Sequence, residues 1–538
     1  MGPINKRMET SEIATSEATP IKTTAPISKG RLARSTAFNF IGQFLPLLAG
    51  IGLMPYIVHG LGPDRFGVLG IAWVVFGYFG LFDFGLGRAT TKFVAEWLSK
   101  SASNAETRQI PVLVWTSIGF QITLGLVGLL VMAACTPLLV GKILKVPPAL
   151  LHEARVTFLI LAASLPLVLV QNSLRAVLEG CQRFDVVNLL RVPSSTLVFL
   201  IPAAALPFGF ELPGIVLALA ISRVLFIAAH VAYCLRELPS LRERPEFSGH
   251  VLRKLISFGG WVTVANIVNP ILVSLDRFLI GSLLSVAMVG YYTAPFEAMT
   301  KIWLIPTSLT ITIFPACSAL GLGRSRELGM LYSRSLKYLF LVLSPVSVVV
   351  VLYASPILHL WLGSDFESKS FRVLQILAIG VPVNCLAHIP YCFLQALDRP
   401  RWPAILFMCE LPVYLAFAWW AITHGGIAGA AMAWSVRVAI EVILLMLMVR
   451  RAFGFSLSSL ISKQMLRAFA ILVLVGSAMT VTKTFTNGWL LGQAGIVAVL
   501  LVVFAIGIWI SVLDDFDRQS IRSLVSPVLG VFRGRIAA

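Results

Sequence analysis

Four basic side chains lie in the interior of long apolar stretches of this sequence, away from the ends of each stretch, where charged groups are costly. They are Arg223, Arg277, Lys301 and Arg437. On insertion scales a cation at the centre of a membrane-spanning helix costs roughly 2.5–3.5 kcal/mol, so four cost on the order of 10 kcal/mol together. Cations in such places could bind an anionic ligand, because a guanidinium can hold two oxygens of one phosphate group at once.

The alternative is that acidic neighbours neutralise some of these cations. Glu297 and Lys301 are four residues apart, and so are Arg437 and Glu441. Residues at this spacing share one face of a helix and can form an ion pair. Lys301 and Arg437 therefore have a purely structural explanation beside the functional one.

The other two cations lack such a partner along the chain. Asp276 and Arg277 are adjacent, so they point in different directions and do not simply neutralise each other. Arg223 has no acidic residue within four positions. We therefore rank Arg223 and Arg277 above the other two as ligand contacts.

Two acidic residues are candidates for coupling to an ion gradient. Asp276 and Glu410 lie in apolar stretches, and neither has a basic residue three or four positions away. Acidic side chains inside a membrane are rare and commonly take part in proton or ion pathways. We predict that these two residues couple transport to protons or sodium.

The elements that must hold these residues are apolar stretches of about twenty residues, each long enough to cross a hydrocarbon core of roughly 30 Å as a helix. They run over 35–58, 66–87, 111–134, 156–178, 186–208, 213–235, 255–284, 287–315, 332–358, 371–396, 402–423, 427–449, 465–485 and 489–513. Most Lys and Arg residues lie in every second gap between them, as the positive-inside rule requires. The pattern predicts an all-α membrane protein with about 14 transmembrane helices and both termini in the cytoplasm.

The composition agrees with a membrane protein. Hydrophobic residues make up 57% of the 538 residues, charged residues make up 13%, and the mean hydropathy is +0.87. We assign the net charge of +18 to cytoplasmic loops facing anionic lipid, and we expect no nucleic-acid partner. The Cys and His residues show no metal-ligand spacing, so we expect no metal site and no cofactor.

Several features argue against an enzyme. The connections between apolar stretches are too short for a catalytic domain, and the chain contains no GxxxxGK[ST] nucleotide-binding motif. Asp515-Phe516-Asp517 has the form of a metal-binding DxD motif, but we interpret it as a solvated helix end. Transport is the function class that remains.

A weak internal repeat predicts the domain organisation. Aligning Gly67 with Gly290 places the first apolar stretch on the seventh, so helices 1–6 and 7–12 would be two copies. Six-helix repeats around a central cavity are common in secondary transporters. The expected parts are a disordered cytoplasmic tail over 1–34, two six-helix bundles over 35–238 and 239–450, helices 13 and 14 over 451–513, and a cytoplasmic tail over 514–538.

Four short motifs resemble those of bacterial polysaccharide exporters. They are Gly62-Pro63-Asp64-Arg65-Phe66-Gly67, Phe82-Asp83-Phe84-Gly85-Leu86-Gly87-Arg88, Leu178-Glu179-Gly180-Cys181-Gln182-Arg183-Phe184-Asp185 with Asn188, and Leu275-Asp276-Arg277-Phe278-Leu279-Ile280-Gly281 with Val289-Gly290-Tyr291-Tyr292. Together with the apolar stretches, the resemblance covers about 35 to 450. The chain is similar to the O-antigen-type oligosaccharide flippases of the MATE-like multidrug/oligosaccharidyl-lipid/polysaccharide superfamily.

The resemblance implies two bundles around a central cavity and alternating access. It also implies a substrate, an undecaprenyl-diphosphate-linked oligosaccharide moved from the inner to the outer leaflet of the bacterial inner membrane for surface polysaccharide biosynthesis. Expected partners are this lipid and membrane lipid, with a glycan polymerase and glycosyltransferases as further candidates and a monomer as the expected state. The alternative is a multidrug/cation antiporter of the same fold, whose cavity should present acidic and aromatic residues.

The expected diphosphate substrate predicts where the basic residues of the membrane helices lie. We expect Arg223, Arg277, Lys301 and Arg437 to converge on one cavity between the bundles, with Arg88 near its cytoplasmic mouth. Matching cations are needed because a diphosphate cannot cross a region of low dielectric constant uncompensated. Recognition of the sugar leaves no spacing signature in the sequence, so its identity stays open.

Overall fold

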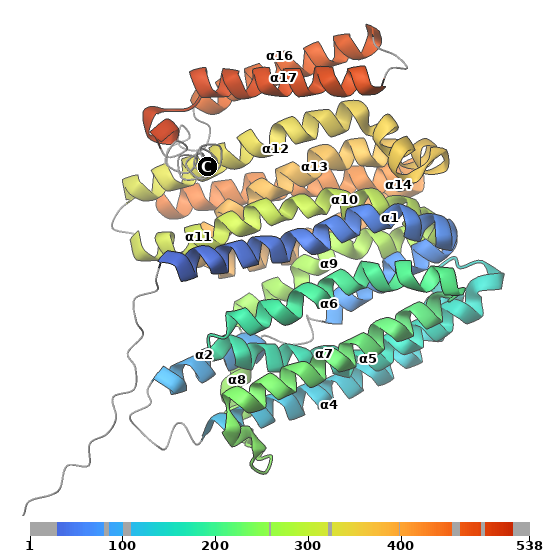
Figure 1. Ribbon diagram of the computed structural model, residues 1–538, viewed down its shortest axis with the longest axis vertical. Coiled ribbons are helices and arrows are strands. Elements are labelled where there is room, and N and C mark those ends of the chain that lie inside the picture. The colour runs from blue at the N-terminus through green and yellow to red at the C-terminus, as the bar shows by residue number, and fades with distance from the viewer. Residues whose placement is uncertain are drawn as a thin grey trace, which may run out of the picture.

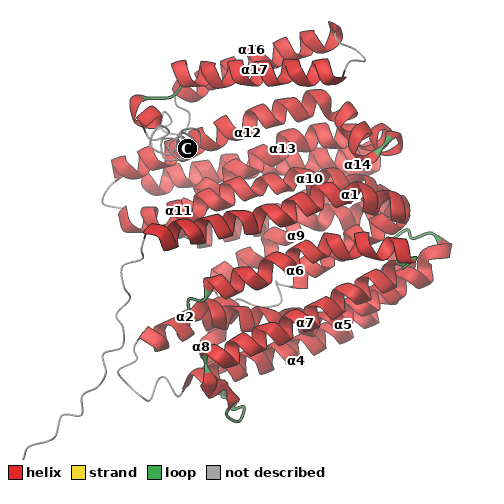
Figure 2. Ribbon diagram, in the orientation of Figure 1, coloured by secondary structure: helices red, strands yellow, loops and turns green. Residues whose placement is uncertain are grey.

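The computed structural model describes residues 29–79, 86–99, 109–257, 260–320, 325–397, 399–454, 463–485 and 490–519. Within these ranges the elements are all helices, with no strand (Figure 2). Ten of the described helices are long and apolar enough to cross a membrane. The chain is therefore a multi-pass, all-helical membrane protein. The expected tail over 1–34 lies almost entirely outside the described residues.

The first half of the chain forms one group of packed helices (Figure 1). Its helices are α1 (Lys29–Phe79), α2 (Leu86–Ser99), α4 (Gln109–Leu138), α5 (Leu151–Gly180), α6 (Phe184–Ala205), α7 (Leu212–Glu237) and the short α8 (Gly249–Ser257). Helix α5 packs against α2, α4 and α7, and α6 packs against α1 and α7. These contacts place α1 along the border with the second half (Figure 1).

The second half forms a further group. Its helices are α9 (Gly260–Leu283), α10 (Val286–Thr300), α11 (Leu304–Leu320), α12 (Ser325–Leu362), α13 (Ser364–Ala396) and α14 (Arg401–Phe453). Helix α13 packs against α12, α14, α10 and α11, and α14 packs against α9. The last two long helices, α16 (Lys463–Phe485) and α17 (Leu490–Ser511), pack on each other and lie beside α12 (Figure 1).

The longest helix, α14, folds back on itself at a glycine. A straight helix of 53 residues would be about 80 Å long, far more than a membrane core. Gly426 has φ 58° and ψ −143°, a backbone conformation that ends the helical path. A Cβ atom added to Gly429 would lie 1.9 Å from the carbonyl oxygen of Ala421, so the two arms run side by side there. The arms match the expected stretches 402–423 and 427–449.

Three other expected stretches also differ in detail from the described helices. In α1, Gly62 with φ 72° separates the stretches 35–58 and 66–87. The stretch 287–315 is divided into α10 and α11 by a 3₁₀ turn over Lys301–Trp303. Hydropathy averages over about 19 residues and cannot locate such breaks, which depend on backbone dihedral angles. The number of fourteen crossings stays a prediction.

Helices α1 and α10 cross at the pair of glycines that suggested the repeat. A Cβ atom on Gly67 would lie 1.7 Å from the carbonyl oxygen of Val286, and one on Gly290 would lie 2.7 Å from that of Pro63. Pro63 and Val286 each lie four residues before the glycine of their own helix. The contact is therefore reciprocal between α1 and α10. The internal repeat that aligns Gly67 with Gly290 stays a prediction.

Gly67→Ala is expected to destabilise the protein by about 1–3 kcal/mol or more, because its methyl group overlaps the backbone of α10. Gly52→Ala in the same helix is the matched control, since nothing lies within 4 Å of its new methyl group. The measurement is thermal unfolding of the purified protein in detergent. Equal stability of the two variants would contradict the close crossing of α1 and α10.

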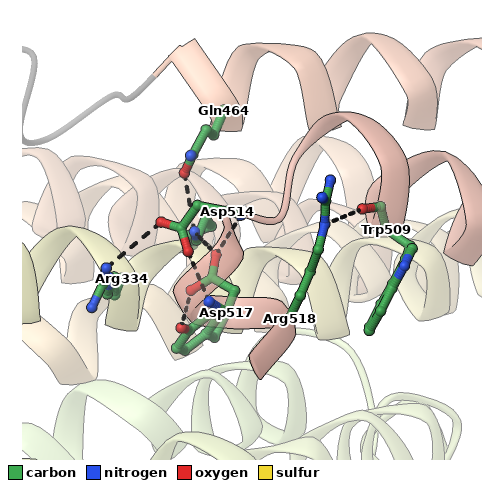
Figure 3. A network of polar contacts seen from close by, with 8 residues as sticks. Arg334, Gln464, Trp509, Asp514, Asp517 and Arg518 are labelled. Atoms are coloured by element: carbon green, nitrogen blue, oxygen red, sulfur yellow. Dashed lines mark hydrogen bonds and ion pairs between the residues drawn. The ribbon is translucent and has the colours of Figure 1, made fainter. Parts of the chain in front are cut away.

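A polar network attaches the segment after α17 to α12 (Figure 3). Asp517 is only 1% exposed, pairs with Lys337 and accepts a hydrogen bond from Tyr338. Burial raises the pKa of Asp517, but its hydrogen bonds with Lys337 and Tyr338 outweigh this effect and lower it overall. Arg334 pairs with Asp514 at 3.6 Å in the same network. Interpreting Asp517 as part of a solvated helix end was wrong, because its acid-base partners come from a helix 180 residues earlier.

Candidate functional site

A cavity of about 390 Å³ lies among helices of the first half, with one lining residue from the second half. Its size is within the range of about 300–1,000 Å³ that is usual for small-molecule sites. The first half contributes Arg223 of α7 and side chains of α1, α5 and α6, and the second half contributes Glu297 of α10. Two of the four expected cations, Arg277 and Lys301, are bonded to that same Glu297.

Arg223 is the cation without an acidic partner in the part of the chain that the structure describes. Its guanidinium stacks over the ring of Phe76, with Cζ 4.7 Å from the ring centroid. Such a contact orients the side chain but leaves the guanidinium N–H groups available as donors. Arg223 thus lies in the wall of this cavity, and its role as a ligand contact stays a prediction.

Glu297 links the cavity to the two cations of the second half. Its Oε1 lies 3.2 Å from Arg277 Nη2, and its Oε2 lies 3.3 Å from Lys301 Nζ. The i,i+4 pair with Lys301 agrees with the structural alternative, whereas the pair with Arg277 joins α9 and α10 and was not visible in the sequence. Among the ionisable groups that line the cavity or bond to Glu297, three are cations and one is an acid.

Aromatic rings hold these two cations in place. Arg277 Cζ lies 4.6 Å from the centroid of Phe296, and Lys301 Nζ lies 5.0 Å from that of Phe199 on α6. The Nε atom of Arg277 is buried without a hydrogen-bond partner. Lys301 also begins the 3₁₀ turn between α10 and α11, a type of break that often marks a hinge. Lys301 therefore contacts both halves of the molecule.

Arg437 lies in other surroundings, and its convergence on this cavity stays a prediction. Its Nη1 pairs with Glu441 at 2.7 Å and with Glu410 at 3.4 Å, between the two arms of α14. All three residues are buried, and Arg437 is not among the described residues that line the cavity beside Arg223. The sequence showed the pair with Glu441 but not that the turn at Gly426 brings Glu410 to the same guanidinium.

The two predicted ion-coupling residues occupy different surroundings. Asp276 is fully buried and accepts hydrogen bonds from the hydroxyl of Tyr292 and from the backbone N–H of Arg277. Glu410 has one oxygen near Arg437, while its Oε1 is buried without a hydrogen-bond partner. Arg437 also lies within electrostatic range of Asp276, so the structure brings both acids near one cation.

A second cavity, of about 340 Å³, lies in the second half of the chain. Its wall includes Glu441, Trp303 and Tyr391 together with Asn384 and His388. Arg88 is exposed at the start of α2 and lies within electrostatic range of Tyr391. Arg88 is not among the described residues that line either cavity, and its place at the cytoplasmic mouth stays a prediction.

The motif turn after α5 has a structural role. Gln182 has φ 56°, and Arg183 pairs with Asp185 at 3.0 Å and with Glu237 at the end of α7. These ion pairs connect the α5–α6 turn to α7. The motif therefore forms a hairpin turn that is fixed to α7 by these ion pairs.

Sequence reasoning missed the neutral wall of the first cavity. This wall carries Trp73, Gln171, Ser194 and Ser195. The indole N–H of Trp73 is buried without a hydrogen-bond partner. An unpaired buried donor is rare and often indicates a bound ligand or water. Single Trp, Gln and Ser residues occur throughout the chain, so no spacing could have identified them.

Three comparisons place this chain among known proteins. The model of the family described as polysaccharide biosynthesis protein matches residues 61–371. A relative from Shigella flexneri, named putative O-antigen transporter, is 30% identical over 414 residues, which are 77% of this chain and 96% of the relative. The lengths of the two matches show that the relationship covers most of the described helices.

Solved transporters share the fold. The lipid II flippase MurJ in an inward closed conformation has a TM-score of 0.68 at 14% identity, covering 88% of this chain and 98% of MurJ. An inward-facing multidrug resistance MATE family transporter of the MOP superfamily has a TM-score of 0.62 at 18% identity, covering 77% of this chain and 94% of that one. The chain therefore has the fold of MOP-superfamily transporters and belongs to the polysaccharide biosynthesis protein family, together with the putative O-antigen transporter of Shigella flexneri.

Proposed function

We propose that this protein is a flippase for a lipid-linked oligosaccharide in the bacterial inner membrane. The observation that carries the proposal is the cavity beside Arg223, a cation with no acidic partner in the described ranges. The names of the Shigella relative and of MurJ support a lipid-linked glycan as the substrate class. An undecaprenyl diphosphate anchor is the specific form we propose.

The charges around the cavity suit a diphosphate. At an effective dielectric constant of about 20, a cation about 4 Å from a phosphate contributes on the order of 4 kcal/mol. Arg223 supplies such a cation directly, and Glu297 can release Arg277 or Lys301 toward a stronger anion. The neutral wall with Trp73, Gln171 and the two serines offers an aromatic ring and hydrogen-bonding groups to the adjoining sugar.

Transport by alternating access is the mechanism we propose. The two bundles over 35–238 and 239–450 would rock about the crossing of Gly67 and Gly290, exposing the cavity to each side in turn. Both termini would lie in the cytoplasm. Cysteine labelling from outside intact cells, on a cysteine-free background, should reach position 425 and not position 182. The opposite labelling pattern would reverse the orientation.

Asp276 and Glu410 are our candidates for coupling this movement to an ion gradient. Each is buried near Arg437, where a proton or a sodium ion would change the balance of charge. Replacing both by their amides should remove any dependence of transport on proton or sodium gradients. If transport and its dependence on these gradients are unchanged in the double variant, coupling does not run through Asp276 and Glu410.

The test of the function is translocation by the purified protein in proteoliposomes. A fluorescent undecaprenyl-diphosphate oligosaccharide should move between leaflets faster than in empty liposomes, as measured by quenching from the outside. The same lipid carrying an uncharged head group should not move faster. If the diphosphate lipid moves no faster than in empty liposomes, the proposal is wrong.

A multidrug/cation antiporter is the second candidate, and the second cavity favours it. That cavity presents Glu441 beside the aromatic residues Trp303, Tyr391 and Phe407, a combination that stabilises positive charge. Efflux of a lipophilic cation driven by a proton or sodium gradient, without translocation of the diphosphate lipid, would select this function. For the flippase function, a glycan polymerase and glycosyltransferases are the further partners that we propose.

A further inference from the structure

A third cavity lies at one end of the second half, away from the groups described above. Its volume is about 620 Å³, and it opens among the turn between α9 and α10, the first turns of α13 and the Gly425–Gly426 turn of α14. These turns all lie on the side that the charge pattern predicts to be outside the cell. Few cations are expected there, because the positive-inside rule gathers them on the opposite side.

Two cations nevertheless line this cavity. Lys369 and Arg372 are three residues apart on α13, so they share one helix face. Arg372 is exposed, and it has no ion-pair partner among the residues that the structure describes. Lys369 pairs with Asp365 at 2.9 Å and donates to the hydroxyl of Tyr291 at 2.9 Å, which uses two of its three protons. The Lys369–Asp365 pair is largely exposed and therefore weak.

The backbone around the cavity adds to its positive character. Helix α10 begins at Val286, directly after Ser285, and the second arm of α14 begins after Gly426. The N-terminus of a helix presents unpaired N–H groups and a positive partial charge. One of these groups, the N–H of Met288, is satisfied by Ser285 Oγ at 3.3 Å. No Asp or Glu is among the described residues that line the cavity.

The rest of the wall is apolar. Leu284, Met288, Phe371 and Ile427 lie beside the two cations. A ligand that contacts both the two cations and the apolar wall must therefore have an anionic head group and a hydrocarbon chain. A lipid with a phosphate ester head group has this chemistry, whereas a free sugar or a soluble peptide lacks the hydrocarbon chain.

We propose that Lys369 and Arg372 bind the phosphate head group of a lipid in the leaflet opposite the cytoplasmic loops. Two lipids present this chemistry, namely the diphosphate carrier after its transfer and a resident anionic phospholipid. Binding of the diphosphate carrier rests on the proposed flippase function, whereas binding of a resident phospholipid does not. In the first case the cavity is a release site, which holds the head group after it leaves Arg223 and before it diffuses away.

The test uses the full-length protein with Arg223→Ala, purified in an uncharged detergent, so that the central cavity lacks its free cation. Farnesyl diphosphate, phosphatidylglycerol and phosphatidylcholine are titrated separately, and binding is followed by native mass spectrometry. We expect a phosphate lipid of net negative charge to bind, and Lys369→Ala with Arg372→Ala to weaken it by about tenfold or more, the effect of losing charge-assisted hydrogen bonds. Zwitterionic phosphatidylcholine should be affected less.

Lys142→Ala is the matched control. Lys142 is exposed and lies three residues before Lys145, whose ammonium donates to the carbonyl of Leu283 beside the cavity at 2.5 Å. The Lys142→Ala substitution removes one positive charge from the same end of the molecule but does not alter the cavity wall. Binding of the phosphate lipid should therefore not change. Lys369→Gln with Arg372→Gln removes both charges but keeps more of each side-chain stem than Ala does, so it separates loss of charge from loss of packing.

The outcomes distinguish the sources and the two proposals. Dependence of farnesyl diphosphate binding on the cation pair identifies the carrier, and dependence of phosphatidylglycerol binding identifies the resident lipid. If neither lipid binds, or if both bind the double variant as tightly as the Lys142→Ala control, the site does not exist. Because this is an equilibrium binding measurement, a failure of the translocation assay would leave its result unaffected.

Discussion

Arg223→Ala is expected to slow translocation of a diphosphate-linked oligosaccharide about a thousandfold. The estimate follows from about 4 kcal/mol for a cation about 4 Å from a phosphate, since each 1.4 kcal/mol is a factor of about ten. Arg223 has no acidic partner among the described residues, so its removal leaves no buried carboxylate unpaired. The amount of folded protein should therefore stay unchanged. The measurement is the initial rate of translocation in proteoliposomes with matched protein content.

Two further variants make this prediction specific. Arg223→Lys keeps the charge but loses the planar fork, so it should recover only part of the rate. Arg236→Ala removes an exposed arginine near the end of the same helix and should translocate at the rate of the unchanged protein. If Arg223→Ala translocates at the control rate, the diphosphate does not use this cavity.

Arg437→Ala is expected to destabilise the protein by about 3–5 kcal/mol, the cost of leaving a buried partner charge uncompensated. Arg437 is 5% exposed and is paired with both Glu410 and Glu441 inside α14. Without it, two carboxylates would face each other between the helix arms. The measurement is thermal unfolding in detergent, supported by the yield of monodisperse protein.

Neutralising the acids should reverse this loss. The triple variant Arg437→Leu, Glu410→Gln and Glu441→Gln carries no charge in the cluster, and replacing a buried ion pair by neutral groups is often close to neutral in stability. Arg450→Ala, an exposed position in the last turn of the same helix, should change stability by about 0.5 kcal/mol or less. A triple variant as unstable as Arg437→Ala alone would show that the cluster is held by packing rather than by charge.

Much of the architecture could be predicted from local properties of the sequence. Hydrophobic length and the distribution of Lys and Arg predict membrane helices, because a helix satisfies its own backbone hydrogen bonds and needs only an apolar surface. The i,i+4 pair of Glu297 with Lys301 and that of Arg437 with Glu441 followed from helix geometry alone, and both are present. The absence of an acid near Arg223 along the chain also corresponds to its unpaired state among the described residues.

The partners that join different helices were decided only by the tertiary structure. Sequence spacing ranked Arg277 with Arg223, yet Arg277 meets Glu297 across two helices. Spacing gave Arg437 only Glu441 as a partner, yet Arg437 also meets Glu410 across the Gly426 turn. Such pairs depend on the angles at which helices cross and on single backbone dihedral angles, which no periodicity encodes. What a charge does within the membrane depends on whether folding gives it a partner. Sequence alone determined which residues are charged and on which helices they lie, and packing determined that Arg223 is the one of the four cations without an acidic partner among the described residues.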